Sequence, residues 1–115
     1  MKLWVQHIIC LICFFMLFGC SDEKIKGKPI YQKSEEISTF VNGSKWDKAS
    51  EEVKAMEELY QKNKWKFQLL GDEMEYSGLN QEIIKLKVSI EEEDKKEAKA
   101  NLALIQDYIR AIYYR

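Results

Sequence analysis

The residue best suited to covalent chemistry is Cys20, which closes the apolar start of the chain. It follows Leu17, Phe18 and Gly19, an order that resembles the bacterial lipobox: a small residue before a cysteine and an apolar residue three places upstream. In lipobox chemistry the Cys20 thiol becomes a diacylglyceryl thioether, and the chain is cut before it. Phe18 is bulkier than the residue usual at its position. The pattern predicts a lipid-anchored mature chain that begins at Cys20.

The segment before Cys20 has the length of a secretory signal. Its uninterrupted apolar run, residues 8–19, is 12 residues long and follows the positive charge of Lys2. The apolar region of a signal peptide has about 7–15 residues, whereas a membrane-spanning helix needs about 20. Extending the run back to Leu3 gives only 17 residues. We therefore expect residues 1–19 to be a lipoprotein signal peptide, with an uncleaved single-pass anchor as the alternative.

Cys10 and Cys13 form a C-x-x-C pair, which in a folded domain would suggest metal or redox chemistry. Both lie in the expected signal peptide, together with His7, the only histidine of the chain. The expected mature chain, residues 20–115, keeps neither a histidine nor a cysteine other than Cys20. Histidine-based triads, cysteine nucleophiles and zinc sites of His and Cys are therefore excluded from it. We expect no metal and no cofactor.

The mature chain is close to neutral in charge. Removing Lys2 with the signal peptide leaves 17 of the 18 basic residues against 19 acidic residues, a net charge of −2. A nearly neutral chain outside the cytoplasm is poorly suited to bind the phosphates of nucleic acid. We therefore expect no nucleic-acid partner.

Two acidic clusters could support carboxylate chemistry: Asp72, Glu73 and Glu75, and residues 91–94. Paired carboxylates hydrolyse glycosides when a cleft holds them at a fixed separation. Clustered carboxylates can also bind calcium, but the EF-hand pattern with its glycine is missing. Helix capping and solvated turns explain both clusters without either activity. We therefore expect the chain not to be an enzyme.

A tryptophan between lysines, in the stretch KNKWKF (62–67), is the best candidate for a binding surface. In a helical register Trp65 falls opposite the apolar face, and Lys62 and Lys66 flank it one turn apart. An exposed tryptophan beside lysines could contact a protein partner, lipid headgroups or a glycan. In the alternative interpretation a short helix at 34–41 folds over Trp65 and buries it.

The secondary-structure elements that would position the candidate residues lie after the signal peptide. Residues 20–33 contain the only proline, Pro29, and we expect them to form a tether between the lipid and the domain. From residue 34 to residue 115 no proline interrupts the chain and β-branched runs are absent, so this part should be one helical domain. A short helix at 34–41 should be capped by Ser34 and end at Asn42-Gly43 in a left-handed turn.

Apolar residues in alternating steps of three and four predict three longer helices, at about 44–70, 73–91 and 95–113. The pairs Ser44 with Asp47, Asp72 with Glu75 and Asp94 with Glu97 have the spacing of helix-capping boxes. The expected fold is an antiparallel three-helix bundle behind the short helix. The predicted inward-facing residues are Trp46, Ala49, Val53, Met56, Tyr60, Phe67 and Leu70; Tyr76, Leu79, Ile83, Leu86 and Ile90, with Ile84 and Val88 beside them; and Ala98, Leu102, Ile105, Ile109 and Ile112. Asn63 falls in the first of these rows, where it either faces water near the helix end or is a buried amide that sets the register.

Three motifs follow one another along the chain: WDKA (46–49), the spaced aromatic residues Tyr60, Trp65 and Phe67, and the acidic junction GDEMEYSGLN (71–80). Together they resemble a family of short membrane-anchored helical proteins and lipoproteins of low-GC Gram-positive bacteria, catalogued only as a domain of unknown function. The resemblance covers residues 44–112 and implies a helical fold, but no activity. The chain departs from the family pattern at Gly71-Asp72, where a histidine is expected, and at Tyr60, where tryptophan is common.

These features predict a non-enzymatic lipoprotein, held by fatty acids such as palmitate on Cys20 at the extracytoplasmic face of the cell membrane. A domain of this size buries a small core, so a protein partner or self-association would stabilise it. Two alternatives remain. One is a surface module centred on Trp65 that binds a ligand, a glycan or a lipid. The other is an uncleaved single-pass membrane protein.

Overall fold

The computed structural model describes residues 4–8 and 23–114, and these residues are helical apart from short turns, as expected for an all-α protein. The lipobox residues Leu17, Phe18, Gly19 and Cys20 lie outside the described residues, and so does the pair Cys10 and Cys13. Beyond the helical turn at 4–8, the helices are α2 (Glu23–Lys26), α3 (Pro29–Asn42), α4 (Trp46–Lys62), α5 (Lys64–Leu70), α6 (Glu73–Glu91) and α7 (Lys95–Tyr113).

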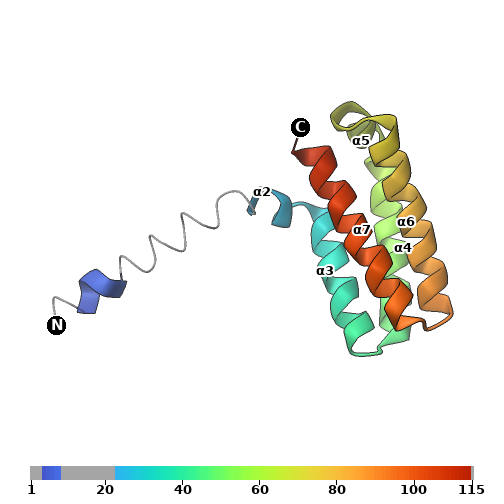
Figure 1. Cartoon of the computed structure of the whole chain (residues 1–115), viewed down its shortest axis with the longest axis horizontal. Helices are drawn as coiled ribbons and strands as arrows, with labels where there is room; N and C mark the ends of the chain where they lie inside the picture. Colours follow the sequence, from blue (N-terminus) through green and yellow to red (C-terminus); the bar gives the residue numbers. More distant parts are fainter. Residues whose placement is uncertain (1–3, 9–22, 115) are drawn as a thin grey trace.

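The long helices α3, α4, α6 and α7 form an antiparallel bundle (Figure 1). α3 packs against α4, α4 against α6, α6 against α7, and α7 closes the ring against α3. Short connections join successive helices, which therefore run in opposite directions, as in an up-and-down bundle. The expected three-helix bundle is corrected, because α3 is a fourth member that encloses the core with the other three.

Helix α3 is longer than the predicted helix at 34–41, because it begins at Pro29. Proline suits the first turn of a helix, where its missing N–H is not needed and its fixed φ is already helical. Ser34 is therefore not a cap: it lies buried within α3, and its hydroxyl donates to the backbone oxygen of Tyr31 at 2.6 Å. The expected tether at 20–33 is corrected as well, because Ile25 of α2 and Ile30 of α3 are both core residues.

The predicted helix at 44–70 is interrupted at Asn63, which separates α4 from α5. The side-chain amide of Asn63 donates to the backbone oxygen of Leu59 at 2.9 Å, and such a local hydrogen bond competes with a continuous helix. Phe67 of α5 is buried, whereas Leu70 is 44% exposed. The predicted inward-facing row of this segment therefore ends at Phe67, and α5 crosses the end of the bundle as a short separate helix.

The core draws on all four long helices. The predicted rows of α6 and α7 are confirmed, except that Tyr76 is half-buried. Ile84 and Val88 are 49% and 48% exposed, because the face of α6 that meets α4 and α7 does not extend to them. The buried apolar residues are Ile25, Ile30, Tyr31, Ile37, Val41, Ala49, Val53, Met56, Tyr60, Phe67, Leu79, Ile83, Leu86, Ile90, Ala98, Leu102, Ile105, Ile109 and Ile112.

Two of the predicted caps are confirmed. Asp72 accepts from the backbone N–H of Glu75 at 3.0 Å, and Glu75 accepts from the backbone N–H of Asp72 at 3.0 Å, which completes a capping box at the start of α6. Asp94 accepts from the backbone N–H of Glu97 at 3.1 Å and caps α7. Ser44 does not cap α4, because it takes a left-handed conformation with φ of 56°.

The turns that follow α3 and α6 have the same geometry. Each closes through a left-handed residue, Ser44 (φ 56°) after α3 and Glu93 (φ 55°) after α6. Gly43, the expected left-handed position, instead has φ of −85°. Each turn makes the two hydrogen bonds of a Schellman motif: Ser44 N–H to Val41 O at 3.0 Å with Lys45 N–H to Phe40 O at 2.8 Å, and Glu93 N–H to Ile90 O at 3.0 Å with Asp94 N–H to Ser89 O at 2.9 Å.

Candidate functional site

The outer face of α5 carries two large apolar side chains that are open to solvent. Trp65 is 59% exposed and Leu69, one turn further on, is 77% exposed, while Phe67 on the opposite face is 1% exposed. The position of Trp65 opposite the buried face is therefore confirmed. The alternative in which the helix predicted at 34–41 buries Trp65 is wrong, because α3 packs against α4 and α7 instead.

A stack of aromatic rings holds α5 against the bundle. The Phe67 ring lies 5.5 Å from the Tyr60 ring at an interplanar angle of 15°, and 6.2 Å from the Tyr113 ring at 80°. The Tyr60 hydroxyl donates to the backbone oxygen of Tyr76 at 3.0 Å. Burial raises the pKa of Tyr60 and of Tyr113, because it disfavours the charged form of each hydroxyl. The outer face of α5 thus rests on packed aromatic rings.

Lysines surround this face. Lys66 lies with its Nζ 5.7 Å from the centre of the Trp65 ring, and Lys28 with its Nζ 4.8 Å from the centre of the Tyr113 ring. Lys62 is exposed, but it ends α4, so the interruption at Asn63 places it on a different helix from Lys66. The predicted flanking pair is thus drawn from two helices, and its role in binding stays a prediction.

A groove of about 410 Å³ runs beside α5. Its walls come from α5, from the start of α3 and from the end of α7, and include Lys28, Pro29, Trp65, Leu69 and Tyr113. Sequence reasoning missed this groove, because it placed Lys28 and Pro29 in a tether. Pro29 was a signal for a helix that starts there, but it carried no information on the groove itself.

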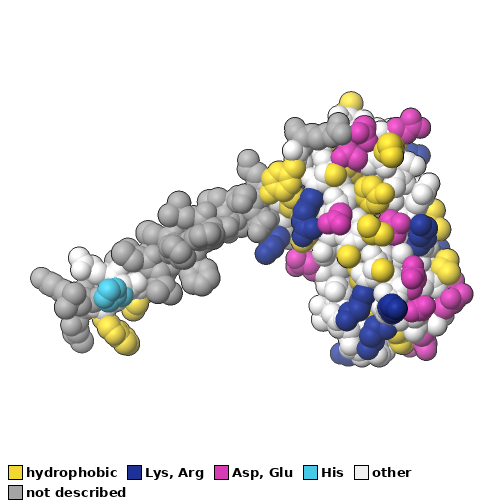
Figure 2. Space-filling view, in the orientation of Figure 1, with side chains coloured by type: hydrophobic (Ala, Val, Ile, Leu, Met, Phe, Trp, Pro, Cys, Tyr) yellow, Lys and Arg dark blue, Asp and Glu magenta, His cyan; other side chains and the backbone are white. Residues whose placement is uncertain are grey.

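Further apolar side chains are exposed at the same end of the bundle. Leu70 is 44%, Met74 83% and Tyr114 52% exposed. Figure 2 shows hydrophobic side chains at the end that carries α5 in Figure 1, with acidic side chains next to them. We call Trp65, Leu69, Leu70, Met74 and Tyr114 the apolar end.

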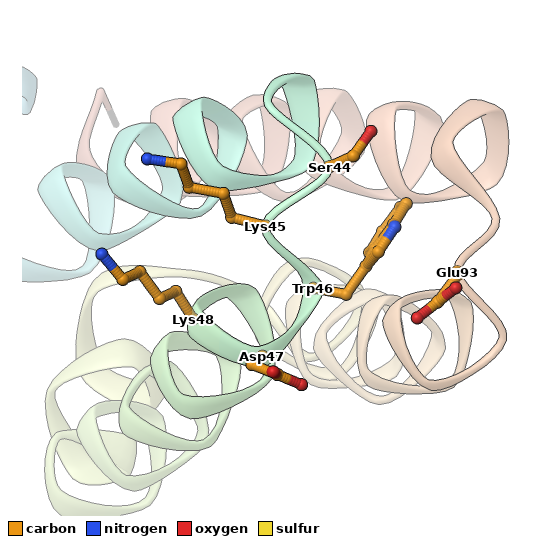
Figure 3. A pocket seen from close by; sticks show the side chains of 6 residues that line it. All are labelled: Ser44, Lys45, Trp46, Asp47, Lys48 and Glu93. Carbon is orange, nitrogen blue, oxygen red and sulfur yellow. The ribbon is translucent and has the colours of Figure 1, made fainter.

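A second hollow, of about 420 Å³, lies at the opposite end of the bundle, between the two Schellman turns. Figure 3 shows the Trp46 ring between Ser44 and Glu93, while Lys45 and Lys48 extend together to the other side. Trp46 is half-buried and packs on the core, and Ala49 is fully buried. The WDKA motif therefore closes this end of the core, and its residues need no ligand to account for them.

The two acidic clusters lie at opposite ends of α6 (Glu73–Glu91), about 27 Å apart along the helix axis. Carboxylates that act together on one glycosidic bond are only about 5–10 Å apart, so the two clusters cannot form such a pair. Within the described residues, no group of three or more His, Cys, Asp and Glu side chains is placed to hold a metal ion. The clusters supply the caps Asp72 and Asp94.

A buried polar network between α6 and α7 was missed by sequence reasoning. Asn101 Nδ2 donates to Glu82 Oε2 at 3.1 Å, and Ser89 Oγ donates to Asn101 Oδ1 at 2.7 Å. Lys85 Nζ lies 3.3 Å from Glu82 Oε1. The position of Asn101 between Ala98 and Leu102 in the helical pattern was the available signal, because it places the amide beside the buried face. The network leaves no carboxylate oxygen of Glu82 without a partner, so it fits a structural role.

Fold and surface together define a class of protein: a small four-helix bundle with an exposed aromatic and lysine-bearing face at one end. The chain belongs to the family described as domain of unknown function (DUF4363), whose family model matches residues 24–115. This confirms the resemblance to a family known only as a domain of unknown function. The match begins in α2, so the family domain includes both α2 and α3.

Searches of curated proteins and of solved structures gave no match to the chain. In the described parts of the chain, none of the helices has both the length and the apolar character needed to cross a membrane.

Proposed function

We propose that this chain is a non-enzymatic lipoprotein, anchored through Cys20 to the extracytoplasmic face of the cell membrane, and that its bundle is an interaction domain. The observation that carries the anchor is the lipobox-like order of Leu17, Phe18, Gly19 and Cys20, placed directly before the family domain that begins at residue 24. In this arrangement the signal, the lipid site and the helical domain follow one another without a long linker.

The interaction role is supported by the outer face of α5. Trp65 combines a large apolar area with a polar N–H, and tryptophan is among the residues that most often dominate binding interfaces. The stacked rings of Tyr60, Phe67 and Tyr113 hold α5 in place, so little conformational freedom is lost when a partner binds. A protein partner or a second copy of the chain is the proposed occupant.

Replacing Cys20 by alanine tests the anchor. In bacterial cells the Cys20→Ala chain should remain uncut and lose its lipid, as measured by the mass of the purified protein and by membrane fractionation. Cys13→Ala, which changes another cysteine of the same segment, should leave both cleavage and lipidation intact. A Cys20→Ala chain that is still cut and membrane-bound would refute the lipid anchor. A wild-type chain in the membrane with Met1 intact would favour the single-pass alternative.

Lysine crosslinking in intact cells tests the interaction role. Lysines occur along the domain from Lys45 to Lys99, so a neighbouring protein should be captured and identified by mass spectrometry. We expect links to one protein, or between copies of this chain, that Trp65→Ala removes. Gln68→Ala, which changes another exposed residue of α5, should preserve them. Links that persist in the Trp65→Ala chain would contradict a partner site at α5.

The second candidate is that the Trp65 surface binds a ligand, a glycan or a lipid. The groove of about 410 Å³ beside Trp65 favours it, because a protein interface does not require such a hollow. Under this proposal Trp65→Ala abolishes ligand binding and leaves the helical circular dichroism unchanged.

A further inference from the structure

We propose that the apolar end of the bundle docks on the membrane that holds the anchor, with Trp65 and Leu69 entering the headgroup region of anionic lipid. This inference rests on the proposed membrane anchor and takes up the lipid form of the second candidate function. The α5 face then contacts lipid in place of a protein partner. Docking would place α5 at the bilayer and the two Schellman turns away from it.

The short connection to the anchor carries the first step of the argument. Only Ser21 and Asp22 separate Cys20 from Glu23, the first residue of α2. Three consecutive Cα–Cα steps reach at most about 11 Å. A chain that is lipidated at Cys20 therefore keeps the start of α2 close to the bilayer surface. The start of α2 is held equally close to the bilayer if residues 1–19 are not removed, because their apolar run ends at Gly19.

The second step is that α2 is fixed to the bundle. Ile25 of α2 is 3% exposed, and α2 packs against both α3 and α7. These contacts hold α2 on the bundle and limit how far the bundle can move from its anchor. The surface next to α2 is therefore held near the bilayer.

The third step identifies that surface. Lys28 and Pro29, which follow α2, line the same groove as Trp65 and Leu69 of α5. The residues that follow α2 and the outer face of α5 thus line one groove. An anchor that holds α2 at the bilayer therefore brings α5 to it as well.

The chemistry of this end suits the headgroup region. Tryptophan favours the membrane interface, where its ring is buried and its N–H stays hydrated. Lysines close to the surface attract anionic headgroups, and Lys28, Lys62, Lys64 and Lys66 all belong to this end. The acidic residues there are Asp72, Glu73 and Glu75, of which Asp72 and Glu75 form the capping box of α6.

The opposite end provides the contrast. The two turns there carry lysines as well, Lys45 and Lys95 among them, so lysine content does not distinguish the ends. Exposed large apolar side chains do distinguish them: within residues 23–114, five of these side chains form the apolar end. The one nearest in sequence to the turns at 43–45 and 92–94 is Val88, which is 48% exposed and lies about one turn before the end of α6. Trp46, at that end, packs on the core.

The two tryptophans of the expected mature chain give a direct test. The lipidated chain is placed in vesicles of phosphatidylcholine and phosphatidylglycerol that contain lipid brominated near the headgroup. One chain carries Trp46→Phe and reports Trp65; the matched chain carries Trp65→Phe and reports Trp46. Trp4→Phe is added to both where the leader is retained. We expect bromolipid to quench Trp65 several-fold more strongly than Trp46, because α4 (Trp46–Lys62) separates them by about 24 Å of helix.

Flotation of the same vesicles separates the inference from the function on which it rests. A chain that floats while Trp65 emits as a water-exposed indole without quenching overturns the inference and leaves the anchor standing. Equal quenching of the two tryptophans overturns the end-on orientation. A chain that does not float refutes the anchor and the inference together. As a second variant, Leu69→Asp changes a side chain that is 77% exposed, so folding should persist; it should reduce quenching of Trp65 while flotation is unchanged.

Discussion

At the scale of single residues, Asn101 is the centre of the buried polar network between α6 and α7. It is 2% exposed and links Glu82 to Ser89. Without it, Glu82 keeps only Lys85, whose side chain is 61% exposed, whereas the Ser89 hydroxyl can turn to the backbone oxygen of Lys85 at 3.0 Å. The main consequence of losing the amide is therefore a poorly satisfied carboxylate.

We predict that Asn101→Leu lowers the free energy of unfolding by about 1–3 kcal/mol, because Glu82 then lacks its buried donor. Adding Glu82→Leu to Asn101→Leu should recover part of the loss, since replacing both partners by apolar groups removes the unsatisfied carboxylate. Urea unfolding followed by circular dichroism measures both chains. A double variant that is less stable than Asn101→Leu alone would contradict this account of the network.

Backbone conformation gives a second prediction at this scale. Glu93 has φ of 55°, a conformation that costs an ordinary residue about 1 kcal/mol and that glycine adopts freely. Glu93→Gly should therefore raise the free energy of unfolding by up to about 1 kcal/mol. Gly43 is the matched control: its φ is −85°, and an added Cβ would come no closer than 3.5 Å to its neighbours. Gly43→Ala should therefore be tolerated, and a marked loss of stability in thermal unfolding would show that Gly43 needs a left-handed conformation.

At the scale of helices, the sequence predicted the position of a helix correctly where its apolar pattern was long and its N-terminal cap was an aspartate. The rows of α6 and α7 and the caps Asp72 and Asp94 follow from side-chain types alone, because each depends on contacts within one helix or across one regular face. The start of α3 at Pro29 was not predicted. Proline occurs both in linkers and in first helical turns, and here only the packing of Ile25 and Ile30 on the other helices decides between them.

The same reasoning applies to the candidate site. The outward direction of Trp65 follows from its register with Phe67, so it could be predicted. The groove could not, because it forms between α5 and the start of α3, and the position of α3 depends on contacts across the whole bundle. The interruption at Asn63 was not predicted either, because the heptad pattern continues through this position.

The contact between α3 and α4 provides a pH-dependent prediction at this scale. Lys33 Nζ lies 2.6 Å from Glu52 and 2.9 Å from Glu36, and these hydrogen bonds, that to Glu52 first, raise the pKa of Lys33 above its usual 10.5. A raised pKa in the folded state means that the stabilisation is complete below pH 10.5 and is lost as the pH rises through the folded-state pKa. The same lysine lowers the pKa of Glu36 below its usual 4.5, so that contribution is present above pH 4.5 and is lost as the pH falls through the lowered value.

We therefore expect Lys33→Met to lower the free energy of unfolding by about 0.5–1 kcal/mol at neutral pH. The difference from the wild type should shrink as the pH rises above 10.5, where Lys33 of the wild type loses its proton. Every other residue is the same in both chains, so its own pH dependence cancels in the difference. Urea unfolding of the two chains between pH 7 and pH 12 measures the difference. A gap that stays constant across this range would show that the methylene groups of Lys33 stabilise the contact, and that its charge does not.

At the scale of the whole molecule, the extent of the folding unit decides how the bundle relates to its anchor. The family match begins at residue 24, and among the side chains that the structure describes from there on, the first buried one is Ile25. A unit that started at residue 34, as the helical pattern suggested, would leave the anchor on a tether of more than ten residues. A unit that starts at α2 leaves Cys20 three residues away, and only then does the orientation of the bundle on the membrane become constrained.

Two fragments distinguish these boundaries. We predict that residues 23–115 fold cooperatively, whereas residues 34–115 are mostly unfolded or aggregate. The shorter fragment lacks Ile25, Ile30 and Tyr31, which are 3%, 3% and 5% exposed, and each large buried side chain contributes about 1.5–3 kcal/mol. It also loses the hydrogen bond from Arg110 Nη2 to the Tyr31 hydroxyl at 3.0 Å. The free energy of unfolding of a small domain is only about 5–15 kcal/mol, so these losses together remove most of it.

Circular dichroism and urea unfolding of the two fragments decide the matter. As a control for deletion itself, a fragment of residues 23–113, which lacks only exposed Tyr114 and the final Arg115, should unfold close to the midpoint of 23–115. If residues 34–115 were as helical and as stable as 23–115, the first turn of α3 would be dispensable and the segment before it could act as a flexible tether. The bundle would then be free to turn on its anchor, and the docked orientation would depend on the affinity of the apolar end alone.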